Sequence, residues 1–369
     1  MNKLDDLIRT TITKILNCNI QDKSWSLASL PIRFGGLGIR KISDVALPAF
    51  LSSVHSTNDL YGKIIFPSLA DVEVSCRTEA REAWEQACPN TELPEALKSQ
   101  RQWDEPLCKQ KYELLLNNSS NSAERARLLA LAEPESGLWL HAIPSANMGT
   151  LLDNTTFHLA VGLRLGVYIN PSHQCRCGDH VHQLAHHGLS CLYSAGRISR
   201  HAALNDLIHR ALVSVNVPAT LEPTGILSDD GKRPDGMSLI PWSRGKSLVW
   251  DATCADTFAP SHLPATSTAA GAAAAAAEKA KRRKYAALDQ SCVFVPFGVE
   301  TMGPWGQDAR HLFQQISTRL VDVSGDKRAG HYLGQRISIA IQRGNAASLL
   351  GTLPQSSSPQ DNGWPFFNK

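Results

Sequence analysis

The sequence predicts an α/β protein with a helical N-terminal half, a zinc knuckle, and a mixed sheet flanked by helices. Three observations predict it. Apolar residues recur at helical spacing near the N-terminus, cysteines and histidines cluster at 175–191, and short β-type segments alternate with helices after residue 196. With 369 residues, 43% of them hydrophobic, the chain is long enough for two or three compact units.

The predicted organisation has five segments. They are a helical segment at 1–70, a helical linker at 71–170, the zinc knuckle at 171–195, the α/β domain at 196–350 and a tail at 351–369. The tail is rich in Pro, Ser and Gln and has no periodicity, which predicts disorder. A helix that starts almost at Met1 suggests a domain that began upstream.

Apolar periodicity in the N-terminal half predicts helices at 4–16, 42–53 and 153–165, the last preceded by a strand-like piece that contains Trp139. The three glycines of FGGLG could cradle a phosphate, but no Lys followed by Ser or Thr completes a phosphate loop. A tight turn is therefore favoured there. Trp139 and His141 are interpreted as scaffold residues.

Composition excludes several classes of protein. A formal net charge of +3 and a pI near 8.3 are too mild to indicate a nucleic-acid partner by themselves. Nine scattered cysteines favour reduced thiols and one metal site over a disulfide framework. No signal sequence or membrane-spanning run is visible, so we expect a nuclear or cytoplasmic protein that is not secreted and has no membrane partner.

The segment CRCGDHVHQLAHHGLSC has the donors of a zinc site. Zinc takes four Cys or His ligands in a tetrahedron, and we predict Cys175, Cys177, His187 and Cys191. The last two are four residues apart, so one helical turn presents them on the same side. His186 is the alternative ligand, and free buried cysteines in a histidine-rich loop are the alternative to a metal. Four protein ligands would make the zinc structural.

After residue 196 the pattern alternates between helix and strand. The predicted elements are a helix at 199–215, strands at 219–223, 234–240 and 247–253, a helix at 266–288 and a strand at 292–299. This order implies a mixed sheet flanked by helices. The run AAGAAAAAAEKAKRRKYAAL is assigned to the long helix because alanine has the strongest helix propensity.

Two acidic residues stand out in this region. Asp235 begins one predicted strand and Asp251 ends the next, and a turn at 241–245 would bring both carboxylates to one edge of the sheet. Two carboxylates at one point can bind Mg²⁺, which would activate a water and offset charge on a phosphodiester. Glu222, on the preceding strand, is a candidate third oxygen ligand.

A phosphoryl-transfer site also needs a cation, and the long helix offers several. Glu278, Lys281 and Tyr285 share one face, with Lys284 beside it, and Lys281 or Lys284 is the candidate active-site lysine. The basic run KAKRRKY, which contains Arg282 and Arg283, would supply phosphate contacts.

Alone, these acids are weak evidence, because Pro-Asp is also ordinary turn chemistry. The adjacent pair Asp229 and Asp230 is interpreted as a solvated turn without a catalytic role. Arg197, Arg200 and His201 begin the helix before the first strand, and they are either DNA contacts or a solvated helix face.

The motifs CRCG, HGLSC, GRISRHAALNDLI, LEPTGI, KRPDG, LVWDATCADT and AEKAKRRKY, in this order, resemble the C-terminal region of non-LTR retrotransposon proteins that cut their target with a restriction-like endonuclease. The early stretch SWSLASLPIRFGGLGIRKISDVALPAFLSS resembles the thumb and linker after the reverse transcriptase palm of these proteins, so residues 1–70 would be thumb-like. The resemblance covers the chain to about residue 350.

The resemblance implies a PD-(D/E)XK-like nuclease. Asp235 would be its first acid, Asp251 its second, and Lys281 or Lys284 its displaced lysine. The common motif has a lysine two residues beyond the second acid, where this chain has Thr253, so activity would depend on a helix lysine. No polymerase palm is visible, and we expect no polymerase activity.

The implied function is nicking of a DNA target with Mg²⁺ as catalytic and Zn²⁺ as structural ion, without a small-molecule cofactor. Element RNA is a further candidate partner. The alternative is an inactive nucleic-acid-binding remnant in which the zinc knuckle and the basic helix hold DNA or RNA but the acids do not assemble. A third, weaker alternative is an inert product without a selected role.

Overall fold

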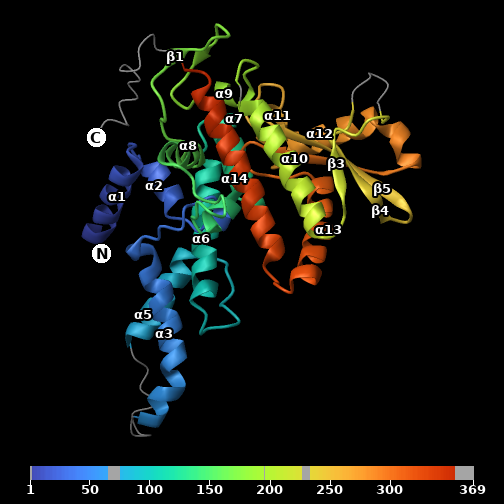
Figure 1. Cartoon of the computed structure of the whole chain (residues 1–369). Coiled ribbons are helices and arrows are strands. Elements are labelled where there is room, and N and C mark those ends of the chain that lie inside the picture. The colour runs from blue at the N-terminus through green and yellow to red at the C-terminus, as the bar shows by residue number, and fades with distance from the viewer. Residues whose placement is uncertain (1, 65–74, 195, 227–232, 354–369) are drawn as a thin grey trace. The chain divides into compact units, whose positions relative to one another are not determined.

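The computed structural model describes residues 2–64, 75–194, 196–226 and 233–353 (Figure 1). The chain divides into two compact units, one of residues 1–16 and 20–119 and one of residues 17–19 and 120–369. The predicted acidic turn at 229–230 and the predicted tail from residue 354 onward lie outside the described residues. The five predicted segments remain predictions.

The first unit is helical. Its elements are α1 (Asn2–Leu16), α2 (Asp22–Ala28), the 3-10 helix η1 (Ile32–Phe34), α3 (Ile42–Ile64), α5 (Ser75–Ala87) and α6 (Gln100–Asn117). α1 is joined to α3 by Asp5, whose carboxylate accepts the backbone N–H of Ile42 at 2.6 Å. Buried Trp84 and Trp103 form the centre of a small core, where the rings meet edge to face at 5.1 Å.

Two predictions for this unit can be compared with the structure. The predicted glycine-rich turn is confirmed: Gly35 and Gly38 have positive φ, and a Cβ on Gly36 would lie 1.9 Å from the Leu30 carbonyl oxygen. The helix predicted to end at residue 53 continues to Ile64, and Pro48 lies inside it. Proline removes one backbone donor there without ending the helix.

The second unit contains both strands and helices. Its helices are α7 (Ser122–Leu131), η2 (Pro134–His141), α8 (Asn154–Leu165), α9 (His187–Ser190), α10 (Gly196–Ser214), α11 (Leu263–Thr266), α12 (Ala272–Lys284), η3 (Ala286–Gln290), α13 (Gln307–Ser324) and α14 (Ala329–Leu350). Its strands are β1 (His173–Gln174), β2 (His180–Val181), β3 (Ala219–Leu221), β4 (Gly236–Ser243), β5 (Lys246–Ala255) and β6 (Val293–Glu300).

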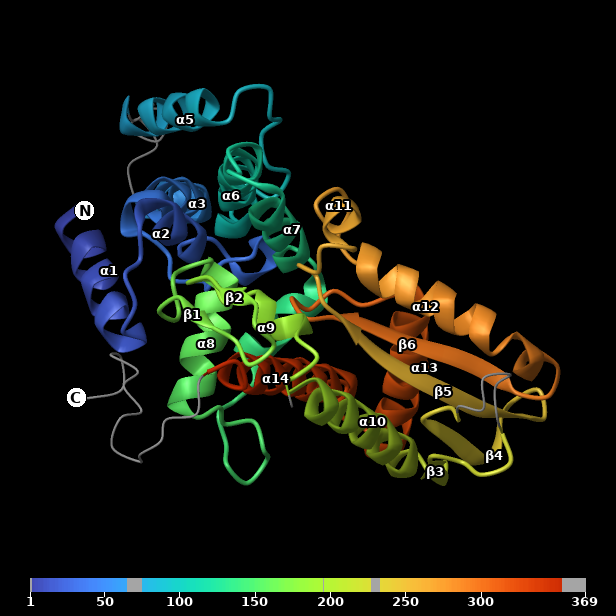
Figure 2. The same ribbon diagram turned by 90° about the horizontal axis from the view of Figure 1, so that it is seen from above.

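The main sheet has the order β3-β4-β5-β6, in which β5 and β6 are parallel and the other neighbours antiparallel. The predicted mixed sheet flanked by helices is therefore confirmed. Alternate residues of β5 enter two apolar clusters: Trp250 packs with α10, α13 and α14, whereas Val249 packs with Tyr285 and Phe294. Figure 2 shows α12 along one side of the sheet and α10 on the other.

Several element boundaries differ from the predictions. Asp251 lies within β5 rather than at its end, because β5 remains paired with β6 as far as Ala255. The hairpin turn is at Arg244 and Gly245, both with positive φ. The long helix begins at Ala272, because Gly271 has the left-handed conformation, φ 76°.

The predicted strand-like piece around Trp139 is wrong. These residues form the 3-10 helix η2, which begins with Pro134 at its first position. Its buried Trp139 donates its backbone N–H to the hydroxyl of Ser338 on α14 at 3.3 Å. Packing against α14 therefore determines the conformation of this short segment, despite its strand propensity.

Candidate functional site

The predicted cysteines and histidine of the knuckle lie together. The ligand atoms of Cys175, Cys177, His187 and Cys191 all lie within 4.8 Å of one another. The sulfurs of Cys175 and Cys191 are 3.7 Å apart, and the sulfur of Cys177 lies 3.2 Å from His187 Nε2. The group can hold a metal ion.

The donor set is compatible with structural zinc. Two thiolates, each about 2.3 Å from a tetrahedral zinc, have sulfurs about 3.8 Å apart, close to the 3.7 Å between the sulfurs of Cys175 and Cys191. His186, the alternative ligand, is directed elsewhere: its ring stacks on Phe258 with centroids 3.9 Å apart. Burial lowers the pKa of His186 to about 4.

Local structure explains why these ligands converge. β1 and β2 form a hairpin in which Cys175 donates its N–H to the Asp179 carbonyl, so both cysteines of CRCG lie in the turn. α9 is the predicted helical turn, and Cys191 N–H donates to the His187 carbonyl at 3.1 Å. His187 Nδ1 lies 3.8 Å from an Asp179 carboxylate oxygen, an arrangement that orients histidine ligands in metal sites.

Asp235 is held at the start of β4. Its backbone N–H donates to the Trp250 carbonyl at 3.1 Å, and its Oδ2 accepts the Ala252 N–H at 2.7 Å. The same Oδ2 lies 2.9 Å from His201 Nε2 on α10. The carboxylate of Asp235 is therefore hydrogen-bonded to the backbone of the residue that follows Asp251.

Asp251 is 3% exposed, and Lys281 on α12 reaches it, with Nζ 2.6 Å from Oδ1. Tyr285, at the end of α12, is buried, and its hydroxyl donates to the Arg233 carbonyl at 3.0 Å. The backbone before Asp235 is thereby joined to the helix that carries Lys281. Of the two candidate lysines, Lys281 contacts Asp251, whereas the Lys284 ammonium lies over the Tyr285 ring, 4.9 Å from its centroid.

The two acids differ in protonation behaviour. Burial, and next the charge of Asp235, raise the pKa of Asp251, although Lys281 opposes the shift. The pKa of Asp235 is lowered: burial acts to raise it, but the hydrogen bond to His201 and the charge of that residue outweigh this. The charge of Asp235 therefore acts on Asp251 in the folded chain.

A pocket of about 460 Å³ opens beside the acids. It is lined by Leu192, Ser194, Arg197, Ile198, Arg200, His201, Ala252, Thr253, Cys254 and Lys281. His201 contacts Asp235 and Lys281 contacts Asp251, so the partners of both carboxylates face this space. Asp235 and Asp251 themselves are not among the lining residues, so the pocket meets the acids only through these partners.

Other predicted site residues lie elsewhere or serve other contacts. Glu222 is exposed just after β3 and lies 3.7 Å from Arg233. Arg200 is buried, donating to Asn345 at 2.8 Å and less closely to the Leu189 carbonyl, so it braces α10 against α14 and α9 rather than projecting as a surface contact.

The basic end of α12 is divided between two roles. Arg282 makes a two-pronged ion pair with Asp308, at 2.6 and 2.8 Å, whereas Arg283 is exposed. Arg197 is also exposed, and its guanidinium lies 3.4 Å from the Ser190 carbonyl. Arg283 and Arg197 are thus the predicted DNA contacts whose positions suit a surface role.

Sequence reasoning missed two functions of polar residues. His201 was predicted as a DNA contact, and its hydrogen bond to Asp235 depends on tertiary structure that its position in GRISRHAALNDLI does not reveal. Glu278 was placed on the face of Lys281. Its burial was not predicted: the carboxylate accepts the backbone N–H of Gly298 on β6 and those of Asp308 and Ala309 at the start of α13.

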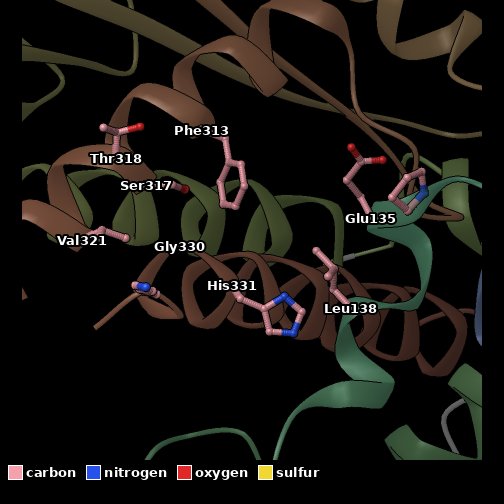
Figure 3. Close-up of a pocket in the computed structure, with 10 residues that line it drawn as sticks. Glu135, Leu138, Phe313, Ser317, Thr318, Val321, Gly330 and His331 are labelled. Carbon is pink, nitrogen blue, oxygen red and sulfur yellow. The ribbon is translucent and has the colours of Figure 1, made fainter. Parts of the chain in front are cut away.

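A second pocket, of about 440 Å³, lies between η2, α13 and α14 (Figure 3). Leu138, Phe313 and His331 face the hollow. Glu135 on its rim is paired with Arg310 at 2.7 Å. None of the predicted site residues lines this pocket.

No family model and no curated protein matches the chain. Across the described ranges, no helix combines the length and the apolar character that a membrane span requires.

Proposed function

We propose that this chain is a metal-dependent DNA endonuclease, from the C-terminal part of a non-LTR retrotransposon reverse transcriptase protein. Asp235, Asp251 and Lys281 form the active site in this proposal. The observation that carries it is that the Asp235 carboxylate accepts the N–H of Ala252, the residue after Asp251, while the Lys281 ammonium lies 2.6 Å from the buried Asp251 carboxylate and lines a pocket. A PD-(D/E)XK-like site requires this combination, with the lysine supplied here by α12 instead of by position 253.

Asp235 and Asp251 would hold Mg²⁺. Magnesium is commonly bound through one or two carboxylates, with waters completing its shell. The buried Asp251, whose pKa is raised by burial and by the charge of Asp235, fits a divalent cation, because positive charge relieves both effects. When bound, the ion would supply a water of lowered pKa and offset charge on the phosphodiester.

The chain's own residues have separate roles in this proposal. Lys281 supplies the positive charge that stabilises charge developing on the phosphate. His201 and the Ala252 N–H orient the Asp235 carboxylate. The cluster of Cys175, Cys177, His187 and Cys191 would hold structural zinc, because its four protein ligands leave no open coordination position.

Plasmid nicking tests the proposal. Purified chain is incubated with supercoiled plasmid in Mg²⁺ and in EDTA, and we expect nicking only in Mg²⁺. Asp235→Asn and Asp251→Asn should each reduce the rate by about a hundredfold or more, with circular dichroism reporting folding. The matched control is Asp206→Asn, on the exposed side of α10, where the aspartate pairs with Arg210. Nicking that survives both site substitutions would refute the assignment.

A second candidate function is a nucleic-acid-binding remnant without cleavage. It is favoured by one observation, that the Lys281 ammonium already neutralises the carboxylate that would bind the metal. This candidate predicts equal DNA affinity in Mg²⁺ and EDTA, and no nicking in either.

A further inference from the structure

Large apolar side chains are exposed at the mouth of the carboxylate-site pocket. Leu192 is 84% exposed, Tyr193 67% and Ile198 77%. Leu192 and Ile198 line the pocket, and Tyr193, which is not itself a lining residue, stands in the chain between the lining residues Leu192 and Ser194. We call these three residues the apolar rim. Exposed apolar side chains that gather at one place mark interaction sites more often than isolated ones do.

The surroundings of the apolar rim are positively charged. Arg197 lines the same pocket, and its guanidinium is exposed. Lys281 and His201 line the pocket as well, where they pair with the carboxylates of Asp251 and Asp235, so Arg197 is the cation on which an anionic occupant would depend. An occupant that complements this site therefore combines negative charge with a flat apolar surface.

Part of the pocket lining consists of short side chains. Ala252, Thr253 and Cys254, at the end of β5, line it. Ala252 follows Asp251 directly in the chain, so this part of the lining is next to Asp251 in the sequence. A base-paired duplex offers charge and base edges but keeps the faces of its bases stacked inside. An unpaired nucleotide offers both a phosphate and an open base face.

We propose that the apolar rim binds unpaired bases next to the phosphate that is cut, so that the preferred substrate is DNA with unpaired nucleotides at the cleavage site. The inference rests on the proposed function, because it concerns the same pocket. Tyr193 provides a stacking surface, and Leu192 and Ile198 act as wedges that keep the base out of the helical stack. Arg197 contacts the backbone phosphate of the same strand.

Cleavage of three matched substrates tests this inference. They are a labelled duplex, the same duplex with a central unpaired loop, and its single strand. We expect the loop substrate to be cut about ten times faster than the duplex. Tyr193→Ala, and separately the double variant Leu192→Ser with Ile198→Ser, should lose most of this preference. These positions are exposed, so their substitution should cost little stability.

Tyr168→Ala is the matched control. Tyr168 is 59% exposed in the same unit, and neither of its chain neighbours lines the pocket, whereas Tyr193 stands between the lining residues Leu192 and Ser194. The same residue change at similar exposure therefore tests for a nonspecific loss of an aromatic side chain. We expect Tyr168→Ala to keep the wild-type preference for the loop substrate.

A binding measurement separates failure of the inference from failure of the proposed function. The loop carries 2-aminopurine, whose fluorescence falls when it stacks on an aromatic ring, and EDTA prevents cleavage. We expect quenching with the wild-type chain and with Tyr168→Ala, and much less with Tyr193→Ala. If no substrate is cut in Mg²⁺ or Mn²⁺, the proposed function fails, and this measurement still decides whether the apolar rim binds bases.

Equal cutting of loop and duplex, or a preference unchanged by the apolar-rim variants, would overturn the inference and leave the proposed nuclease in place. If Tyr193→Ala does not reduce the quenching, the inference is overturned as well. A protein partner would then be the explanation for the exposed apolar side chains.

Discussion

The Cys/His cluster and the carboxylate site lie in the same compact unit but are built differently. The cluster takes all its ligands from residues 175–191, within one hairpin and one helical turn. The carboxylate site takes its groups from α10, the start of β4, β5 and α12. The short distance in sequence between its residues is enough to form the Cys/His cluster. The carboxylate site, in contrast, forms only when the sheet and both helices have formed.

The Cys/His cluster and the carboxylate site also differ in their electrostatics. The cluster brings together soft ligands that gain from a bound cation. The carboxylate site brings together two acids that repel each other, and Lys281 and His201 partly compensate. A metal ion should therefore contribute to folding at the cluster and mainly to charge balance at the acids. The predictions that follow test this contrast.

The largest expected effect is at the cluster. Cys191→Ser should abolish stoichiometric zinc binding and lower the Tm by on the order of 5–10 °C, because the metal joins the hairpin to α9. Zinc content by mass spectrometry and thermal unfolding measure these effects. Cys76→Ser, at an exposed free cysteine, should change neither. A chain that keeps its zinc after Cys191→Ser would contradict the assigned ligands.

The next effect concerns the two lysines of α12. Lys281→Ala should lower the nicking rate by about 10²–10³-fold, because the charge next to Asp251 is lost. Lys284→Ala, which removes a cation–π contact to Tyr285, should lower it less than about tenfold. Single-turnover nicking measures both rates. Equal losses in the two variants would show that Lys281 has no special role.

A smaller effect is the pH dependence of the His201 contact. The hydrogen bond that His201 donates to the Asp235 carboxylate raises the pKa of His201 above its usual 6.5. The protonated pair therefore stabilises the fold fully below pH 6.5, and this contribution disappears as the pH rises through the raised pKa. His201→Gln should thus lower the Tm more at pH 6 than at pH 9, by about 1–3 °C, since His201 is 45% exposed.

The control for the His201 prediction is a second background. In Asp235→Asn the partner charge is absent, so His201→Gln should produce the same small change at both pH values. A pH-dependent difference that persists in this background would assign the effect to another group.

The smallest effect concerns the basic end of α12. Arg283→Ala should lower the slope of log K against log salt for DNA binding by about 1, as expected for one lost phosphate contact. Arg282→Ala should leave the slope nearly unchanged, because Asp308 already engages that guanidinium. Fluorescence anisotropy over a salt series measures both slopes. Equal changes of the slope in the two variants would mean that the ion pair between Arg282 and Asp308 breaks when DNA binds.

The sequence predicts local features well and tertiary ones poorly. The gathering of Cys175, Cys177, His187 and Cys191 in one cluster could be predicted from their spacing, and the mixed sheet from the order of elements. The choice between Lys281 and Lys284 could not be predicted from the sequence. The two residues lie on different faces of α12, and only the packing of the helix on the sheet determines which face meets Asp251. The burial of Arg200 and the break at Gly271 were missed for the same reason.

The most direct test of the account is a crystal structure of the chain grown with Mn²⁺, which substitutes for Mg²⁺ and gives an anomalous signal. The account predicts one peak with oxygens of both Asp235 and Asp251 in its coordination shell, and the Lys281 ammonium moved away from Asp251 Oδ1. A peak bound by only one of these acids, or no peak between them at saturating Mn²⁺, would contradict it.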